Sequence, residues 1–205
     1  MKNYSADIEK CKESLVYFRS RRLFFKQMVE EDITDEYLAW LNDPEVTRFL
    51  EIRFSQQSRE NVIDYIRKSL SKENKTLHLG VFDKEGGRLI GTVTFHDIDE
   101  HHRSACISFV IGHPDARGKG YGSEAVHAAT HYMFKVRGFV KLWGGYYEGH
   151  AASERVFLKN GYQIEGRLKG KLVNFSGERV DHILMGLLAE DFKPNPKILR
   201  GTEER

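Results

Sequence analysis

The chain of 205 residues is long enough for one large domain, and no interior stretch is rich enough in Pro, Ser or Gly to serve as a linker. With 40% hydrophobic and 30% charged residues it can bury a substantial core, which excludes a disordered chain. A net charge of +2 creates no global field that would favour nucleic acid or a membrane surface as a partner. We expect one domain at residues 21–190, with an N-terminal extension at 1–20 and a C-terminal tail at 191–205, where prolines and charges predict disorder.

The two cysteines and the N-terminal residues indicate a cytoplasmic protein. Cys11 and Cys106 are too few for a disulfide framework and lack the spacing of a zinc site, so we expect no metal. Residues 1–9 are polar and charged, unlike a signal peptide, and no run approaches the roughly 18 apolar residues that cross a bilayer. We therefore expect neither secretion nor insertion into a membrane.

The first half of the domain is predicted to begin with a strand and two helices. The apolar run at 23–28 has the length of a strand. Asp32 is expected to cap a helix that ends at Asn42-Asp43-Pro44, and a second helix is predicted over 59–70 from its apolar spacing. Strands at 76–82, 88–96 and 105–111 follow, and their short links favour antiparallel neighbours because a parallel pair needs a long crossover.

The second half of the domain is predicted to alternate helices with strands. Its expected elements are a helix at 123–136, a strand at 140–146, a helix at 151–159, and strands at 162–165 and 180–188. Together with the antiparallel strands of the first half, this order predicts a mixed α/β domain.

A glycine-rich loop between a strand and a helix contains the most informative residues of the chain. The strand at 105–111 leads into Arg117-Gly118-Lys119-Gly120-Tyr121-Gly122, after which helical spacing resumes. Glycines allow the backbone to curl closely, and a helix start presents unpaired N–H groups with a positive partial charge. Such a loop can bind a diphosphate, but it lacks the Lys-Ser/Thr of a Walker loop and the spacing of a dinucleotide fingerprint.

Arg117-x-x-Gly120-x-Gly122 resembles the signature of the GNAT superfamily of N-acetyltransferases. The resemblance runs from about Leu23 to Leu188 and is similar to the branch of ribosomal-protein N-terminal and nucleotide-sugar amine acetyltransferases. It also includes the segments Trp40–Val46, Gly91–Val93, Ser153, Lys159–Tyr162 and Glu165-Gly166. It implies a mixed, mostly antiparallel sheet of about seven strands with about four helices, splayed where coenzyme A binds. The implied activity is acetyl-CoA-dependent N-acetylation.

The resemblance also implies which residues contact acetyl-CoA. The amides expected to hold its pyrophosphate belong to Gly118, Lys119, Gly120, Tyr121 and Gly122, with the cations of Arg117 and Lys119 at the rim. Val110 and Ile111 are expected to pair with the pantetheine arm, since a strand edge matches an extended, amide-bearing chain. Ser153 is expected to touch the coenzyme, although an ordinary serine at a helix start is an equal alternative.

The proton-transfer residues of the family are not matched in this chain. Cys106 stands at the position of the family's glutamate, Phe157 at that of its tyrosine and His150 at that of its asparagine. No histidine is paired with Cys106 in the sequence, so we expect direct attack by the amine rather than an acyl-enzyme.

Three other residues are candidate proton acceptors. They are Glu51 in the loop at 48–54, where the resemblance implies the acceptor pocket, His96 at the end of a strand, and Glu148 just beyond the strand at 140–146. We refer to residues 48–54 as the expected acceptor loop. Histidine titrates near neutral pH, which suits a general base. For each residue the alternative is a structural histidine or a solvated surface acid.

The missing glutamate favours an acceptor amine of low pKa. A lysine-like amine with a pKa of about 10.4 costs roughly 4 kcal/mol to deprotonate near pH 7.4, whereas an α-amine near 7.8 costs below about 1. Arg48 and Arg53 lie in the expected acceptor loop, and arginine binds phosphate well, so a small-molecule amine such as a nucleotide-linked amino sugar is the first choice. An N-terminal α-amine of a ribosomal or other protein is second, and a non-catalytic coenzyme A-binding domain stays open. A homodimer is compatible with the sequence, and a nucleic-acid partner is not expected.

Overall fold

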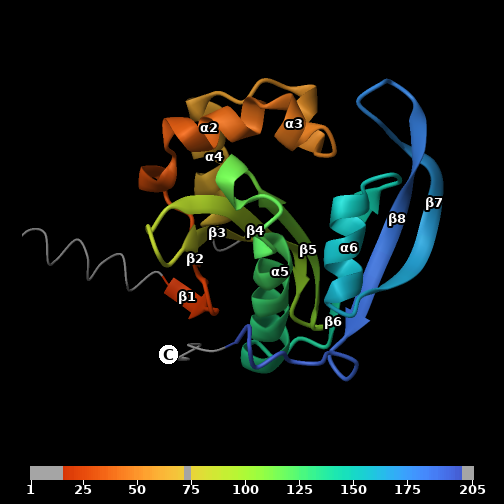
Figure 1. Ribbon diagram of the computed structural model, residues 1–205. Helices are drawn as coiled ribbons and strands as arrows, with labels where there is room; N and C mark the ends of the chain where they lie inside the picture. Colours follow the sequence, from red (N-terminus) through yellow and green to blue (C-terminus); the bar gives the residue numbers. More distant parts are fainter. Residues whose placement is uncertain (1–15, 72–74, 200–205) are drawn as a thin grey trace, which may run out of the picture.

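The computed structural model describes residues 16–71 and 75–199. An eight-stranded sheet in the order β1-β2-β3-β4-β5-β6-β8-β7 forms its centre (Figure 1). The strands are β1 (Val16–Arg19), β2 (Leu23–Gln27), β3 (Leu77–Asp83), β4 (Leu89–Asp99), β5 (Ser104–Ile111), β6 (Lys141–Tyr147), β7 (Gln163–Val173) and β8 (Arg179–Leu188). The α-helices are α2 (Asp35–Asn42), α3 (Pro44–Thr47), α4 (Arg59–Ser69), α5 (Tyr121–His131) and α6 (Ala151–Lys159).

Helices cover both faces of the sheet because side chains alternate along its strands. Val81 packs with α5 in the larger core, whereas its neighbour Phe82 packs with α2 and α4 in a second, smaller core. Strands of this kind are apolar on both faces, which explains why β3 is buried along its whole length. The expected mixed α/β fold with a mostly antiparallel sheet is confirmed, including the antiparallel pairing of β3, β4 and β5.

One strand was not predicted. Residues 16–19 were assigned to the N-terminal extension, but they form β1 and pair with β2 in antiparallel register. Phe18 stacks on Phe25 with ring centroids 4.3 Å apart and so joins the main core. Short strands at a sheet edge depend on their partner more than on their own pattern, which is why the sequence did not indicate this one. The remainder of the expected extension, residues 1–15, lies outside the described residues.

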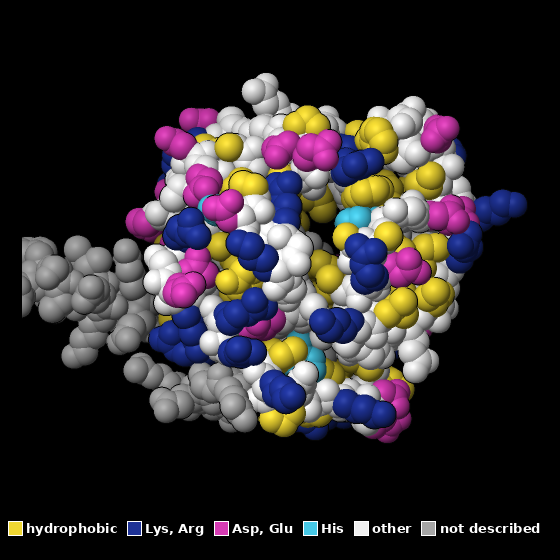
Figure 2. Space-filling view, in the orientation of Figure 1, with side chains coloured by type: hydrophobic (Ala, Val, Ile, Leu, Met, Phe, Trp, Pro, Cys, Tyr) yellow, Lys and Arg dark blue, Asp and Glu magenta, His cyan; other side chains and the backbone are white. Residues whose placement is uncertain are grey.

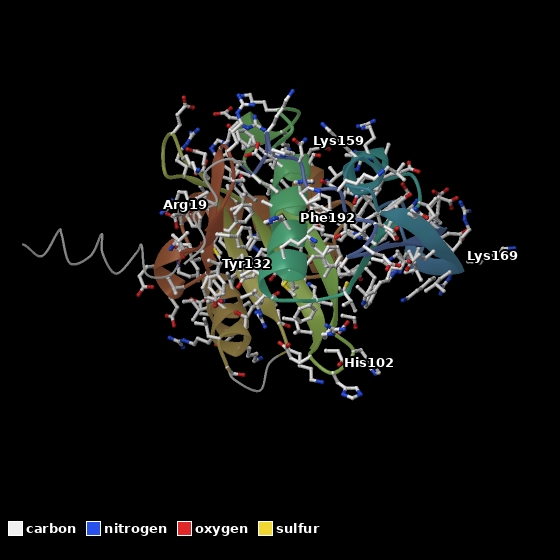
Figure 3. The ribbon with its side chains drawn as sticks, turned by 90° about the horizontal axis from the view of Figure 1, so that it is seen from below. Arg19, His102, Tyr132, Lys159, Lys169 and Phe192 are labelled. Atoms are coloured by element: carbon white, nitrogen blue, oxygen red, sulfur yellow. The ribbon has the colours of Figure 1, made fainter. Side chains whose placement is uncertain are left out.

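The C-terminal segment is packed rather than disordered over residues 192–198. Phe192 is buried against α5, next to His127 (Figure 3). The Asn195 amide donates to His127 Nε2 at 2.9 Å, and the Arg21 amide donates to the carbonyl of Ile198 at 2.7 Å. The prediction of a disordered tail is therefore wrong for this stretch, because one buried aromatic side chain and two hydrogen bonds hold it against the domain.

The cap of α2 also differs from the prediction. Thr34, not Asp32, is the N-cap, and its hydroxyl accepts from the Tyr37 amide at 3.1 Å. Asp32 instead accepts from Lys26 Nζ at 2.5 Å, an ion pair of two largely buried side chains.

The helix predicted at 123–136 begins earlier, at Tyr121, and passes into a π-helical turn at Tyr132–Val136. None of the helices in the described ranges is long and apolar enough to cross a membrane.

Candidate active site

A fork between two neighbouring strands creates the candidate site. β5 and β6 are parallel and pair only at their starts, where the last pair is Cys106 with Trp143. Beyond that pair β5 remains bonded to β4 and β6 to β8, so the facing edges of both strands are left without a partner strand within the described chain. Gly144 lies in the fork, where an added Cβ would be 2.7 Å from the Ile107 carbonyl oxygen and 2.9 Å from the Phe157 ring. Only glycine fits there.

The glycine-rich loop lies at the end of β5 and has the geometry of an anion site. Gly118 and Gly120 have φ of 73° and 79°, a left-handed conformation that glycine adopts without strain. Gly120 caps α5 without any side-chain hydrogen bond, and the amides of residues 118–122 donate to no acceptor in the described part of the chain. A Cβ at Gly118 would meet nothing within 4 Å, so this side of the loop is open to a ligand. The loop could therefore hold a diphosphate through backbone N–H groups.

The two cations of the loop differ in their surroundings. Arg117 is turned back, because its Nη2 donates to the Gly112 carbonyl at 2.7 Å and lies 3.8 Å from Asp43 Oδ2. Lys119 is exposed at the rim. Figure 2 shows Lys and Arg side chains around a hollow in this face of the molecule.

A cavity of about 560 Å³ opens beside the fork and reaches under α2 and α4. The sequence-predicted residues in its wall are Glu51, His96, Val110 and Ser153, together with His150 and Phe157. Ile111 and Glu148 do not line it. Glu148 is exposed, and its carboxylate accepts from Arg167 Nη1 at 2.9 Å. The fold therefore brings Glu51 and His96 to one cavity and leaves Glu148 outside it.

One buried and two half-buried histidines make the cavity rich in neutral imidazoles. Burial lowers the pKa of His96, whose Nε2 is 2.9 Å from Ser108 Oγ. Burial also lowers the pKa of His78 and of His150 to about 4, with the neighbouring Arg48 adding to the effect at His150. These rings are uncharged at neutral pH, so each can accept a hydrogen bond. Because their pKa values are lowered, they are weak bases toward a proton.

A carboxylate and a phenol meet at the acceptor side of the cavity. The Tyr147 hydroxyl donates to the Glu51 carboxylate, and Arg53 Nη1 donates to the same hydroxyl oxygen at 3.1 Å. Burial and the adjacent carboxylate raise the pKa of Tyr147, so its proton stays on the phenol. Glu51, in the 3-10 turn Glu51–Phe54, is thus held in the cavity wall by a residue at the end of β6.

Two of the three departures from the family pattern, Cys106 and Phe157, have clear structural surroundings. Burial raises the pKa of Cys106 to about 12, which disfavours the thiolate needed for an acyl-enzyme. Phe157 is 1% exposed and packs edge-on against Phe109, with ring centroids 5.6 Å apart. A nearby hydroxyl in the cavity wall belongs to Tyr146, whose pKa burial and Glu154 raise to about 12.

Sequence reasoning missed His78, Tyr147 and His182 as residues of the cavity wall. Each lies within or at the end of a predicted strand, where alternation alone does not tell which face will border a cavity. The adjacent Tyr146-Tyr147 pair at a strand end was the available signal. Among the described residues, no group of three or more His, Cys, Asp or Glu side chains is placed to hold a metal ion.

Similar proteins are acetyltransferases. A family model described as an acetyltransferase (GNAT) domain matches residues 22–163. The uncharacterised N-acetyltransferase YoaA of Bacillus subtilis is 30% identical over 150 residues, which cover 72% of this chain and 83% of that protein. The [ribosomal protein uS5]-alanine N-acetyltransferase of Escherichia coli is 27% identical over 124 residues, 60% of this chain and 63% of the relative.

Solved structures of acetyltransferases have a similar fold. Spermidine N-acetyltransferase from Vibrio cholerae, solved in complex with CoA and spermine, superposes with a TM-score of 0.73 at 20% identity. The match covers 83% of this chain and 97% of that one. With a family model over more than half of its length and the forked sheet in place, the chain belongs to the GNAT family of acetyltransferases.

Proposed function

We propose that this protein transfers the acetyl group of acetyl-CoA to a primary amine of low pKa. The observation that carries the proposal is the fork between β5 and β6, whose open edge connects the glycine loop to a cavity lined by neutral histidines. GNAT acetyltransferases use acetyl-CoA. The glycine loop at one end of the fork suits its diphosphate, and the cavity at the other end has room for its acetyl group and an amine.

The loop and the open strand edge would hold the coenzyme. The amides of residues 118–122 would bind its diphosphate, on the open side of Gly118. Val110 and Ile111 would offer backbone groups to the pantetheine arm, and Ser153 would border the cavity at the start of α6. When bound, acetyl-CoA supplies the thioester that the amine attacks, and the buried walls of the cavity keep water away from it.

His96 and Glu51 would handle the proton and the charge of the amine. The Glu51 carboxylate attracts the ammonium form into the cavity. His96, neutral because burial lowers its pKa, then accepts a proton from the amine. Such a weak base suits an α-amine, which is already partly neutral at pH 7.4, better than a lysine side chain.

The acceptor that we favour is the N-terminal α-amine of a protein or peptide. Arg53, considered above as a phosphate ligand, already donates to the carbonyls of Leu50 and Val173 and to Tyr147. Arg48 lies between the Phe49 and Phe175 rings. The Arg53 guanidinium is therefore committed to hydrogen bonds within the chain, and the Arg48 guanidinium is packed against aromatic rings, which argues against nucleotide recognition. A relative that acetylates a ribosomal-protein alanine supports the same acceptor class.

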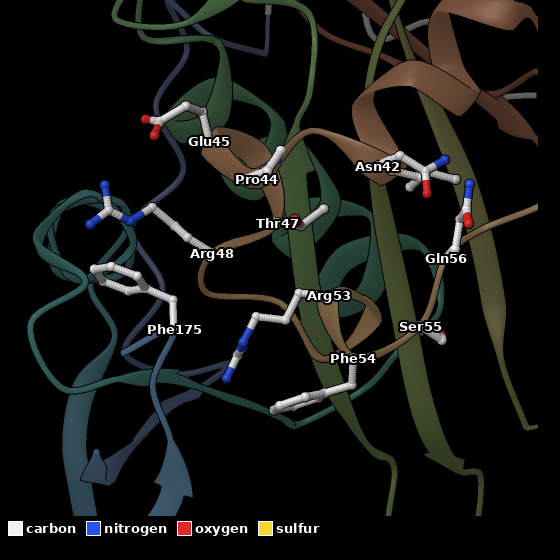
Figure 4. A pocket seen from close by; sticks show the side chains of 11 residues that line it. Asn42, Pro44, Glu45, Thr47, Arg48, Arg53, Phe54, Ser55, Gln56 and Phe175 are labelled. Carbon is white, nitrogen blue, oxygen red and sulfur yellow. The ribbon is translucent and has the colours of Figure 1, made fainter. Parts of the chain in front are cut away.

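A nucleotide-linked amino sugar is the second candidate. A groove of about 550 Å³, lined by Arg48, Arg53 and Phe175 among others, is shown in Figure 4. It lies beside the cavity, because Leu41 is in the wall of both. Its wall includes Arg48, whose buried Nε has no hydrogen-bond partner within the described residues. An acceptor with a phosphate could satisfy that donor.

Competitive turnover with a panel of amines would test the proposal. We expect CoA to stabilise the fold by about 2.7 kcal/mol at 100 times its Kd, and peptides with a free α-amine to be acetylated fastest. Faster acetylation of lysine ε-amines than of α-amines and amino sugars would contradict a low-pKa acceptor. Coenzyme binding without transfer to any amine of the panel would instead favour a non-catalytic domain.

A further inference from the structure

The glycine loop is contacted from behind by the turn between β1 and β2. Glu124 lies in the first turn of α5 and is 5% exposed. Its carboxylate accepts from Ser20 Oγ at 2.8 Å, from the Arg22 amide at 2.7 Å and from Arg22 Nε at 2.7 Å. These bonds connect two segments about a hundred residues apart in sequence, and all of them end at the helix that follows the loop.

The Arg22 guanidinium also contacts the loop itself. Its Nη1 donates to the Lys119 carbonyl at 3.1 Å, and its Cζ lies 4.1 Å from the centre of the Tyr121 ring. A Cβ at Gly120 would be 3.8 Å from Nη2. Arg22 therefore lies against three successive loop residues while its Nε is bound to Glu124.

We propose that Arg22 is a positioning residue that sets the direction of the loop amides for the coenzyme diphosphate. The Lys119 carbonyl and the Gly120 N–H belong to one trans peptide plane, in which the two groups point in opposite directions. Because Arg22 holds the carbonyl, the Gly120 N–H is directed to the other side of the loop. The inference rests on the proposed function, since it assigns the coenzyme diphosphate to this loop.

Arg22 has a second effect through charge. The first turn of a helix favours an anion, and Glu124 places its own carboxylate there, close to where a diphosphate would bind. The ion pair with Arg22 neutralises that carboxylate. Without the Arg22 guanidinium the carboxylate would keep the bonds from Ser20 Oγ and the amide of residue 22 but would lack a charge partner and would repel the ligand.

Substitutions of Arg22 test the inference with two measurements, one without any ligand. In the free protein, backbone NMR order parameters at residues 118–121 should fall in Arg22→Ala from about 0.85 to below about 0.6. The Kd for CoA, measured by calorimetry, should rise by about tenfold, within the range of couplings in one network. The values for Arg22→Lys should fall between those of the unaltered protein and those of Arg22→Ala. An ammonium group keeps the charge but lacks the planar guanidinium, which binds Glu124 and the Lys119 carbonyl at the same time.

Arg67→Ala is the control, because Arg67 of α4 makes a more exposed arginine–glutamate pair with Glu30, with Nε 2.5 Å from Oε1, and neither residue belongs to the loop or to α5. The double variant R22A/E124Q separates positioning from charge. A Kd that stays weak in the double variant supports positioning, and a restored Kd overturns it. Unchanged loop order, or an unchanged Kd, in both Arg22 variants also overturns the inference. If the unaltered protein fails to bind CoA, the proposed function is wrong. The order parameters of residues 118–121, measured without ligand, would still show whether Arg22 holds the loop.

Discussion

The Tyr147 hydroxyl donates a hydrogen bond to the Glu51 carboxylate in the wall of the cavity. Tyr147 ends β6, whereas Glu51 begins the 3-10 turn Glu51–Phe54 that follows α3. The bond thus connects the end of β6 to the turn that follows α3, on the other side of the cavity. Because hydrogen bonds to charged groups contribute about 1.5–3 kcal/mol, this one can fix the position of the carboxylate.

Tyr147→Phe is expected to weaken binding of the acceptor amine more than binding of the coenzyme. Loss of the hydroxyl frees the Glu51 carboxylate to move away from the cavity, so KM for the amine should rise about tenfold or more. KM for acetyl-CoA should change little, since Tyr147 is at the acceptor side. Steady-state kinetics with each substrate varied in turn would measure both constants.

Tyr17→Phe is a suitable control, because within the described residues the Tyr17 hydroxyl donates to Gln27 Oε1, at 3.4 Å, and Tyr17 is not in the wall of the cavity. An amine KM that is equally unaffected in both variants would show that the bond has no part in acceptor binding.

This tyrosine also shows where sequence reasoning stops. The glycine loop could be recognised because all its determinants are local: a strand, two left-handed glycines and a helix start. The order of elements followed from periodicity for the same reason. The hydrogen bond between Tyr147 and Glu51 depends on how β6 and the turn at Glu51–Phe54 come together around a cavity. No local sequence pattern indicates that contact. β1 escaped prediction similarly, since its strand exists through pairing with β2.

His96→Gln is expected to lower kcat by about 100-fold, at the low end of general acid–base catalysis. Glutamine can still bond to Ser108 but cannot accept a proton from the amine. In the unaltered enzyme kcat/KM should rise with pH as His96 loses its proton, at a pKa below the ordinary 6.5 because burial lowers it. That acidic limb should be absent from the pH profile of the variant.

His102→Gln provides the comparison, because His102 is exposed in the turn between β4 and β5 (Figure 3). If His96→Gln kept both the rate and the acidic limb, His96 would not be the base, and Glu51 would be the next residue to test.

Acidification should destabilise the fold through His78. Burial lowers the pKa of His78 from 6.5 to about 4, so the folded protein resists a proton that the unfolded chain accepts. Between those pH values the unfolded state binds more protons, and the free energy of unfolding falls as pH decreases. The loss of stability amounts to about 3 kcal/mol in total, is absent above about pH 6.5 and is complete below about pH 4.

Urea unfolding of the unaltered protein and of His78→Gln across this pH range would measure the effect. The variant should lose stability less steeply as pH falls, whereas His101→Gln, at an exposed position, should follow the unaltered protein. Parallel curves for all three proteins would show that His78 is protonated in the folded state.

Gly118→Ala should impair coenzyme binding beyond its cost in stability. A residue with a Cβ is strained at φ of 73°, by about 1–2 kcal/mol, and the new methyl group would occupy the open side of the loop. Gly177→Ala is closely matched, since Gly177 has φ of 82° and equally open surroundings at the β7–β8 hairpin. Both variants should therefore lose similar free energy of unfolding, but only Gly118→Ala should raise the Kd for CoA, by about tenfold. Equal Kd values in the two variants would place the diphosphate elsewhere than on the open side of Gly118.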